Sequence, residues 1–454
     1  MSGSARVDES LSELRQSLVG AVIGPEDAEY DAARRGFNAL IDRRPAVIAR
    51  CVGAGDVAAA LDFARAHGLD VAVRGGGHNP AGHCVCDDGL VIDLSAMRTV
   101  DVDADARIAR ADGGATWLDF DAATQAFGLV TPGGVVGSTG VCGLTLGGGI
   151  GHLTAQHGLT CDDLVGAEVV TPDGTVVSAS SDENADLLWA LRGGGGNFGV
   201  ATRLEFRLHA LDRVVGGLLT FGGKGVRDVL RRFRDVAARS PRDLSCQAGL
   251  SVDESVAPVV VVAPCYTGSD ADPGELRELR SAPGLADDGV RAQTFLDQQR
   301  VFDSAYGTNR HYWKGHFVRE LPDELLDELL RRMVGLGRPP GGILIESLHG
   351  TPNDVDPATA AVGFRNAAFN VSVMATWTDP GLDDEYIAWA RDTAAAIEPW
   401  SFSGGGYVNY MQADEPIERV RAAFGDAAFE RLQALKRRYD PANVLRRNQN
   451  ITPA

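Results

Sequence analysis

Residues 73–83, VRGGGHNPAGH, hold the residue types with the clearest chemical use. Residues 70–74, DVAVR, predict a short strand that stops at three consecutive glycines. These glycines leave backbone N–H groups uncovered. Consecutive N–H groups in such a turn form an anion-binding nest that suits a pyrophosphate. Because His78 follows the glycines directly, its imidazole is expected to lie beside the bound group.

Glycine is unusually abundant, at 55 of 454 residues, and it is concentrated in clusters. The clusters fall at residues 75–77, 133–151, 193–199 and 404–406. Because glycine lets the backbone approach a ligand closely, the first three clusters predict one ligand that several loops surround.

The glycines at 194, 196 and 199 match the spacing G-x-G-x-x-G of dinucleotide-binding proteins. That motif requires a strand before it and a helix after it, since the pyrophosphate rests on the helix N-terminus. Here a helix is expected before the glycines and a strand after them, so a Rossmann site is disfavoured. The P-loop pattern G-x-x-x-x-G-K-[ST] and the hydrolase pattern G-x-S-x-G are absent from the sequence.

A zinc site at His78, His83, Cys84 and Cys86 is a further alternative, because both residue types bind zinc. The two cysteines are separated by only one residue, and no second pair follows. The spacing favours the interpretation that both cysteines are small apolar residues packed beside a strand, so no metal site is predicted.

The elements that must position these residues fall into three regions. Strands and helices are closely mixed up to about residue 210, and apolar strands then alternate with amphipathic helices up to about residue 400. This order predicts an α+β protein whose second part is a sheet covered by helices on one side. We expect a cofactor-binding domain at 1–212, a substrate-binding domain at 213–400 and a segment at 401–454 that returns to the first domain.

Composition limits the possible partners. The formal net charge of −19 disfavours nucleic acid and anionic membrane surfaces, and no apolar run approaches the ~20 residues that cross a bilayer. The N-terminus lacks the pattern of a secretory signal, and seven scattered cysteines are typical of reduced thiols. A cytoplasmic location is therefore expected.

The sequence resembles the berberine bridge enzyme-like FAD-linked oxidases of bacterial type, within the vanillyl-alcohol oxidase superfamily. Six segments carry the resemblance in order: RGGGHNPAGH, GLVIDLSAM, GGGIGHLTAQHGLTCDDLVGAEVVTPDG, LLWALRGGGGNFGV, YVNY and RRYDPANVLRRNQNITP. The region between about 215 and 400 matches only weakly. The resemblance implies a PCMH-type FAD-binding domain of two subdomains, and an α+β substrate domain with an antiparallel sheet covered by helices.

The resemblance further implies extended FAD with His78 joined to the 8α-methyl carbon of the flavin ring. Many relatives carry a second link through a cysteine, at the position that Val136 occupies here. Cys142 lies nearby, where relatives have glycine, so a single link is expected. The cofactor-binding residues implied in this way are Arg74, Gly75, Gly76, Gly77, His78, Asn79, Gly82, His83, Gly134, Val136, Gly140, Cys142, Gly143, Gly148, Gly149, His152, Gly199, Val200, Tyr407 and Asn409.

For catalysis, the resemblance implies that Tyr410, the second tyrosine of YVNY, accepts the substrate proton. Glu346 and Asn370 are further candidates on strands of the substrate domain, although the register is open because His349 and Gly350 stand where relatives have two glycines. The plainer alternatives are a Tyr410 that faces the core and a Glu346 that faces solvent. Two weaker candidates come from one strand: Tyr312 and Lys314.

The expected activity is that of an oxidase. It would move a hydride from a small alcohol, amine or phenolic substrate to FAD and then pass the electrons to dioxygen. A flavin dehydrogenase with another electron acceptor, and a flavin-binding protein without turnover, are the alternatives. Substrate identity and oligomeric state are open at this point.

Overall fold

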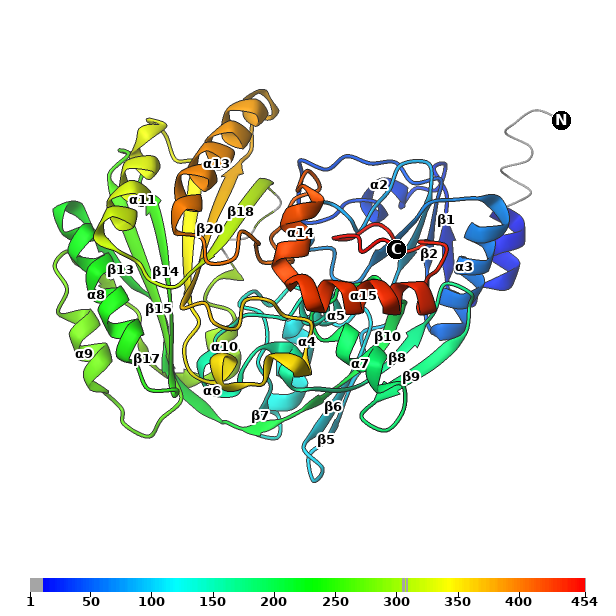
Figure 1. Ribbon diagram of the computed structural model, residues 1–454, viewed down its shortest axis with the longest axis horizontal. Helices are drawn as coiled ribbons and strands as arrows, with labels where there is room; N and C mark the ends of the chain where they lie inside the picture. The colour runs from blue at the N-terminus through cyan, green and yellow to red at the C-terminus, as the bar shows by residue number, and fades with distance from the viewer. Residues whose placement is uncertain (1–10, 304–306, 308, 454) are drawn as a thin grey trace.

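The computed structural model describes residues 11–303, 307 and 309–453, and arranges them around four β-sheets (Figure 1). The first sheet has four strands in the order β1-β2-β4-β3, with β2, β3 and β4 parallel and β1 antiparallel to β2. The bounds are β1 (Ala21–Ile23), β2 (Val47–Arg50), β3 (Val71–Arg74) and β4 (Leu90–Asp93), and the short helix α2 (Tyr30–Ala33) follows β1.

The second sheet is antiparallel, in the order β5-β6-β10-β8-β9. Helix α3 (Ala54–His67) packs between the first two sheets, because its apolar residues Val57, Leu61 and Ala64 join one core with strands of both. The strands are β5 (Val100–Asp103), β6 (Ile108–Asp112), β8 (Leu164–Val170), β9 (Val176–Ser180) and β10 (Val200–Arg207).

Short helices connect these strands and carry the glycine loops. Helix α4 begins at Thr116, where Thr116 and Asp119 cap each other reciprocally, as in a capping box. The helices are α4 (Trp117–Gln125), α5 (Val141–Leu146), α6 (Thr154–His157) and α7 (Ala185–Leu191), and a small ladder pairs β7 (Leu129–Val130) with β11 (His209–Ala210).

The largest sheet has nine antiparallel strands, in the order β16-β13-β15-β14-β19-β20-β18, with β12 and β17 at one side. Strands β14, β15, β18, β19 and β20 have an apolar face under the helices, and alternation along β18, β19 and β20 places Trp313, Leu344 and Met374 on the opposite face. Bounds are β12 (Arg213–Gly216), β13 (Leu219–Gly222), β14 (Leu244–Val252), β15 (Pro258–Tyr266), β16 (Leu285–Asp288), β17 (Arg291–Thr294), β18 (Arg310–Val318), β19 (Gly341–Ser347) and β20 (Phe369–Trp377).

Four helices cover one face of this sheet, on the left in Figure 1. They are α8 (Val226–Arg239), α9 (Gly274–Arg280), α11 (Asp323–Gly335) and α13 (Asp383–Ile397). Their buried residues form one core with the strands, as the amphipathic pattern predicts. Two shorter helices, α10 (Phe295–Gln299) and α12 (Thr351–Asp354), lie toward the first part of the chain.

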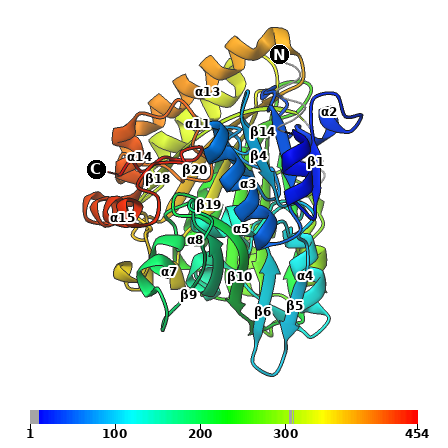
Figure 2. The ribbon, with the colours of Figure 1, turned by 90° about the vertical axis from the view of Figure 1, so that its right-hand side faces the viewer.

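The chain then returns to its first part through α14 (Ile417–Phe424) and α15 (Asp426–Tyr439). Phe429 and Leu432 of α15 share a core with Leu187 of α7, and Figure 2 shows α15 alongside α7. The predicted α+β class is confirmed, whereas the division at 212 and 400 stays a prediction. Within the described part of the chain, no helix has both the length and the apolar character that crossing a bilayer needs.

Candidate active site

One cavity brings the first three glycine clusters together with the large sheet and the C-terminal tail. It is lined by many of the residues expected to bind the cofactor, and by Tyr410. The expected residues on its wall are Gly75, Gly76, Gly77, His78, Asn79, His83, Val136, Gly140, Cys142, Gly143, Gly199, Val200 and Asn409.

Seven expected cofactor residues lie outside this wall: Arg74, Gly82, Gly134, Gly148, Gly149, His152 and Tyr407. Several of them support the wall from behind. The Arg74 guanidinium pairs with Asp93 at 3.4 Å, and the Tyr407 hydroxyl accepts from the Gly149 N–H at 3.1 Å. His152 is buried and stacks on Phe302, with ring centroids 6.0 Å apart.

The glycine turn after β3 touches the loop before α5 through backbone atoms. A Cβ at Gly76 would collide with the backbone nitrogen of Gly140, and one at Gly140 would lie 2.5 Å from the nitrogen of Gly76. Gly77 has φ of +71°, a left-handed conformation that favours glycine. Only glycine therefore lets the two loops meet here, and this contact brings His78 against residues 138 and 139.

The His78 imidazole has partners at both nitrogens and on one ring face. The Ser138 hydroxyl lies 2.9 Å from Nε2, and the Thr139 hydroxyl lies 3.4 Å from Nδ1. Phe37 stacks on the ring, with centroids 4.7 Å apart and planes 14° from parallel. Burial lowers the pKa of His78 to about 4, so the imidazole is neutral at pH 7.

The three catalytic candidates are brought together. The pairing of β19 with β20 places Glu346 directly opposite Asn370, whose Nδ2 donates to Glu346 Oε2 at 2.6 Å. The Tyr410 hydroxyl donates to Glu346 Oε1 at 3.4 Å. Glu346 is fully buried, and burial raises its pKa to about 7 against the opposing effect of these two hydrogen bonds.

Strand β18 contributes to the cavity a residue that the sequence did not single out. Trp313 of β18 lines the cavity and contacts Tyr410 edge-on, with ring centroids 5.5 Å apart. Its neighbours Tyr312 and Lys314 face the opposite side, where Tyr312 donates to Asp414 and Lys314 to Glu415, each at 2.7 Å. Strand alternation thus separates these two weaker candidates from the cavity.

The cysteines near His78 are buried, free thiols, and burial raises the pKa of Cys86 to about 11. Among the residues that the structure describes, no cluster of three or more His, Cys, Asp or Glu side chains could hold a metal ion.

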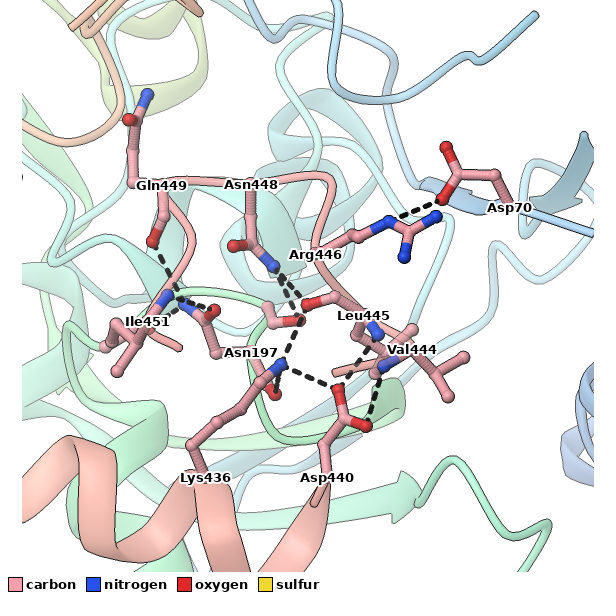
Figure 3. Close-up of polar contacts among 12 residues, drawn as sticks. Asp70, Asn197, Lys436, Asp440, Val444, Leu445, Arg446, Asn448, Gln449 and Ile451 are labelled. Atoms are coloured by element: carbon pink, nitrogen blue, oxygen red, sulfur yellow. Dashed lines mark hydrogen bonds and ion pairs between the residues drawn. The ribbon is translucent and has the colours of Figure 1, made fainter. Parts of the chain in front are cut away.

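The C-terminal tail also lines the cavity, and Figure 3 shows the polar contacts that hold it. The buried Lys436 ammonium donates to Asp440 at 2.6 Å and to the backbone carbonyls of Asn197 and Leu445, at 2.8 and 2.9 Å. The Asn197 side chain in turn accepts from the N–H of Ile451 at 3.0 Å. This network holds the tail against the third glycine cluster. The tail residues on the wall are Leu445, Arg447, Asn448 and Gln449.

Sequence reasoning placed the tail near the cofactor but named none of these tail residues. The polar run RRNQNI was visible in the sequence, yet only the fold decides which of its side chains turn inward. Phe37 carried no signal at all, because it lies in a segment without periodicity or motif.

The cavity has the features that a large, flat, anionic cofactor needs. Gly143 and Gly196 line it, and no atom of the residues that the structure describes lies within 4 Å of where a Cβ would stand. Two buried polar atoms on the wall, His83 Nε2 and Asn448 Oδ1, have no hydrogen-bond partner among the described residues. Arg447, whose guanidinium pairs with Asp70, brings a positive charge to the wall, and apolar residues such as Val200 add a surface for rings.

Comparison with known proteins identifies the cofactor. Residues 45–180 match the FAD binding domain, and residues 406–452 match the domain described as berberine and berberine like. (R)-6-hydroxynicotine oxidase of Paenarthrobacter nicotinovorans is 32% identical over 452 residues, which cover 96% of this chain and 97% of that protein. The chain belongs to the berberine bridge enzyme-like FAD-linked oxidases.

Solved structures share the fold of this chain. The crystal structure of 6-hydroxy-D-nicotine oxidase from Arthrobacter nicotinovorans has a TM-score of 0.87 and 29% identity, covering 96% of this chain and 99% of that one. Glucooligosaccharide oxidase from Acremonium strictum, a protein with 6-S-cysteinyl, 8α-N1-histidyl FAD, shares the fold at a TM-score of 0.86 and 23% identity, covering 99% of each chain. The protein is therefore an FAD-linked oxidoreductase, and its cavity fits FAD.

Proposed function

We propose that the protein is an oxidase that takes a hydride and a proton from a small alcohol, amine or phenolic substrate and passes the electrons to dioxygen. Bound FAD supplies the two-electron acceptor. The observation that carries the proposal is the hydrogen bond from Tyr410, on the cavity wall, to the buried Glu346. A cavity that only stored flavin would have no need of this proton acceptor.

The proton path begins at Tyr410. Its hydroxyl accepts the proton of the substrate O–H or N–H and gives its own proton to Glu346 Oε1, so Tyr410 ends the step neutral. A tyrosine alone, with an ordinary pKa of ~10, is a poor base at pH 7. A carboxylate whose pKa lies at about 7 is matched to that pH. Asn370 orients the carboxylate through Oε2.

The cofactor attachment is proposed at His78 alone. The lone pair of a neutral imidazole is available for bond formation, and burial keeps this imidazole neutral at pH 7. Val136 stands on the wall where relatives carry a second linking cysteine. Burial raises the pKa of the nearby Cys142 thiol to about 12, so the reactive thiolate is scarce.

The attachment is tested by acid precipitation of the purified yellow protein. The colour should enter the pellet in the parent and stay in the supernatant in His78→Ala. His83→Ala is a matched control, because this second histidine lies on the same wall. A yellow pellet from His78→Ala, or a colourless one from the parent, would contradict attachment at His78.

The oxidase activity is tested by anaerobic photometry. A panel of alcohols, sugars and amines should include compounds that bleach the flavin, and air should then restore its colour. The oxidative step is also measured without a substrate, on enzyme reduced by dithionite and mixed with dioxygen. Rapid reoxidation in proportion to dioxygen supports an oxidase. Slow reoxidation in air, with fast reoxidation by a quinone, would instead identify a dehydrogenase.

A further inference from the structure

Residues 37–39 join the His78 turn to the large sheet, although they lie outside both matched domains, 45–180 and 406–452. The Phe37 ring is held between two imidazoles. It stacks on His78 at 4.7 Å and 14°, and on His311 of β18 at 4.3 Å and 12°. Trp313, two residues further along β18, meets Phe37 edge-on at 5.7 Å.

The backbone of this segment holds the same turn. The Phe37 N–H donates to the carbonyl of Gly77 at 3.1 Å, immediately before His78. Ring and backbone of Phe37 therefore constrain both the turn and the side chain that it presents.

Asn38 ties the turn to the sheet. Its buried carboxamide Nδ2 donates to the carbonyls of Pro80 and His311, at 2.7 and 2.8 Å, and its Oδ1 accepts from the His311 N–H at 2.8 Å. The next residue, Ala39, donates its N–H to the carbonyl of Asn309 at 2.8 Å. One side chain thus satisfies backbone groups of the loop after His78 and of β18.

We propose that Phe37 is a positioning residue for flavin attachment, and that Asn38 anchors it. The inference rests on the proposed link at His78. In that link the 8α-methyl group of FAD would lose a C–H proton and the imidazole its N–H proton as the C–N bond forms; the flavin would take up the two electrons, and dioxygen would reoxidise it. A ring nitrogen forms a bond only along its lone pair, which lies in the imidazole plane. Stacking on Phe37 restricts rotation of that plane, while Ser138 and Thr139 contact its two nitrogens. Without the stack, the imidazole would sample orientations in which the lone pair misses the cofactor.

The test measures how fast flavin becomes covalent. Protein produced under riboflavin limitation is mixed with FAD, and acid-precipitable flavin is followed over time. Phe37→Leu and Phe37→Met both remove the stack and keep an apolar side chain. We expect attachment to slow by about 2- to 10-fold, the range for loss of an aromatic pair. Phe37→Tyr should restore the parent rate, and total FAD bound before precipitation should not change.

Phe127→Leu is the matched control, because that phenylalanine is exposed on the surface and should leave the rate unchanged. Attachment at the parent rate in Phe37→Leu would overturn the inference. Loss of cooperative thermal unfolding in both Phe37→Leu and Phe37→Met would overturn it too, since Phe37 would then be a scaffold residue. A parent protein without covalent flavin would instead refute the His78 link itself.

Discussion

Two fully buried carboxyl groups, Glu346 and Asp440, each accept a hydrogen bond from a residue of the cavity wall, and their surroundings differ. Asp440 faces the Lys436 ammonium at 2.6 Å and accepts from the backbone N–H groups of Val444 and Leu445, at 2.8 and 2.9 Å (Figure 3). The donors to Glu346 among the described residues are neutral: the Asn370 amide and the Tyr410 hydroxyl.

This difference in surroundings suits one carboxyl to a structural role and the other to proton transfer. Breaking a buried ion pair that also accepts hydrogen bonds from several donors is costly, so such a pair fixes geometry. A buried carboxyl without a cation has a raised pKa and exchanges its proton near neutral pH. Asp440 therefore fastens the tail against the cofactor cavity, whereas Glu346 is suited to receive a proton.

The largest effect is expected from Tyr410→Phe, which keeps the ring and removes the oxygen next to Glu346. General-base assistance contributes roughly 10²- to 10⁴-fold, so flavin reduction should slow by that factor, or about 3–5 kcal/mol in barrier. Stopped-flow reduction under nitrogen measures the rate, and the flavin spectrum should not change. Tyr386→Phe is the control, since its hydroxyl binds a backbone carbonyl on the helix side of the sheet.

If Tyr410→Phe reduces its flavin at the parent rate, Tyr410 is a packing residue. Glu346 would then have to accept the substrate proton directly.

The next effect concerns the stability that the buried Lys436–Asp440 pair gives to the C-terminal tail. Lys436→Met leaves Asp440 buried and unpaired, which typically costs about 3–5 kcal/mol in the free energy of unfolding. Chemical denaturation should detect this loss. Combining Lys436→Met with Asp440→Asn should recover part of it, because the unpaired carboxylate is removed. Arg438→Met, which breaks the exposed pair with Asp186, should cost about 1 kcal/mol or less. Equal losses in the two single variants would contradict a structural role for the buried pair.

The His78 turn and the Glu346 strand differ in how far sequence reasoning reached. The glycine turn and His78 were predictable, because a backbone nest is a local property of consecutive residues. Glu346 was left uncertain, since a shift of one residue in a strand moves a side chain to the other face. Only the pairing of Glu346 with Asn370 resolves that register.

Phe37 and Trp313 were missed for related reasons. Phe37 acts through contacts with residues far along the chain, which no local pattern encodes. On β18, Tyr312 and Trp313 are both buried, so apolar character could not tell which one faces the cavity. The FAD-linked activity was predicted through a resemblance spread over six segments and is confirmed, while the substrate class stays a prediction.

A smaller effect, dependent on pH, is expected from Glu346→Gln. In the parent, flavin reduction should rise with pH through about 7, because only the ionised carboxylate accepts a proton. In Glu346→Gln this rise should disappear, and the rate at pH 8 should fall by less than roughly 10²-fold, because Tyr410 can still pass its proton to solvent. A reduction rate that keeps the same pH profile in both proteins would assign the titration to another group.

The raised pKa of Glu346 also predicts how the free energy of unfolding changes with pH. Its folded pKa lies above its usual value of 4.5, so its favourable contribution is complete below about pH 4.5 and is lost as pH rises through about 7. The parent should therefore lose about 3 kcal/mol relative to Glu346→Gln across that window. Denaturation of both variants at pH 4.5 and pH 8 measures the difference.

The smallest effect is expected from Cys142→Ala, which removes a buried thiol that can be compared with the buried carboxyl of Glu346. Burial without a cation raises the pKa of Cys142 to about 12, far above neutral pH, whereas the same physical cause brings Glu346 to about 7. Cys142 should therefore act only in packing, within the core around α5. The fraction of flavin in the acid pellet should equal that of the parent, with a stability loss of about 1 kcal/mol for the vacated volume. If His78→Ala retained covalent flavin and His78→Ala/Cys142→Ala lost it, the thiol would be a second attachment point, and burial would not have made it inert.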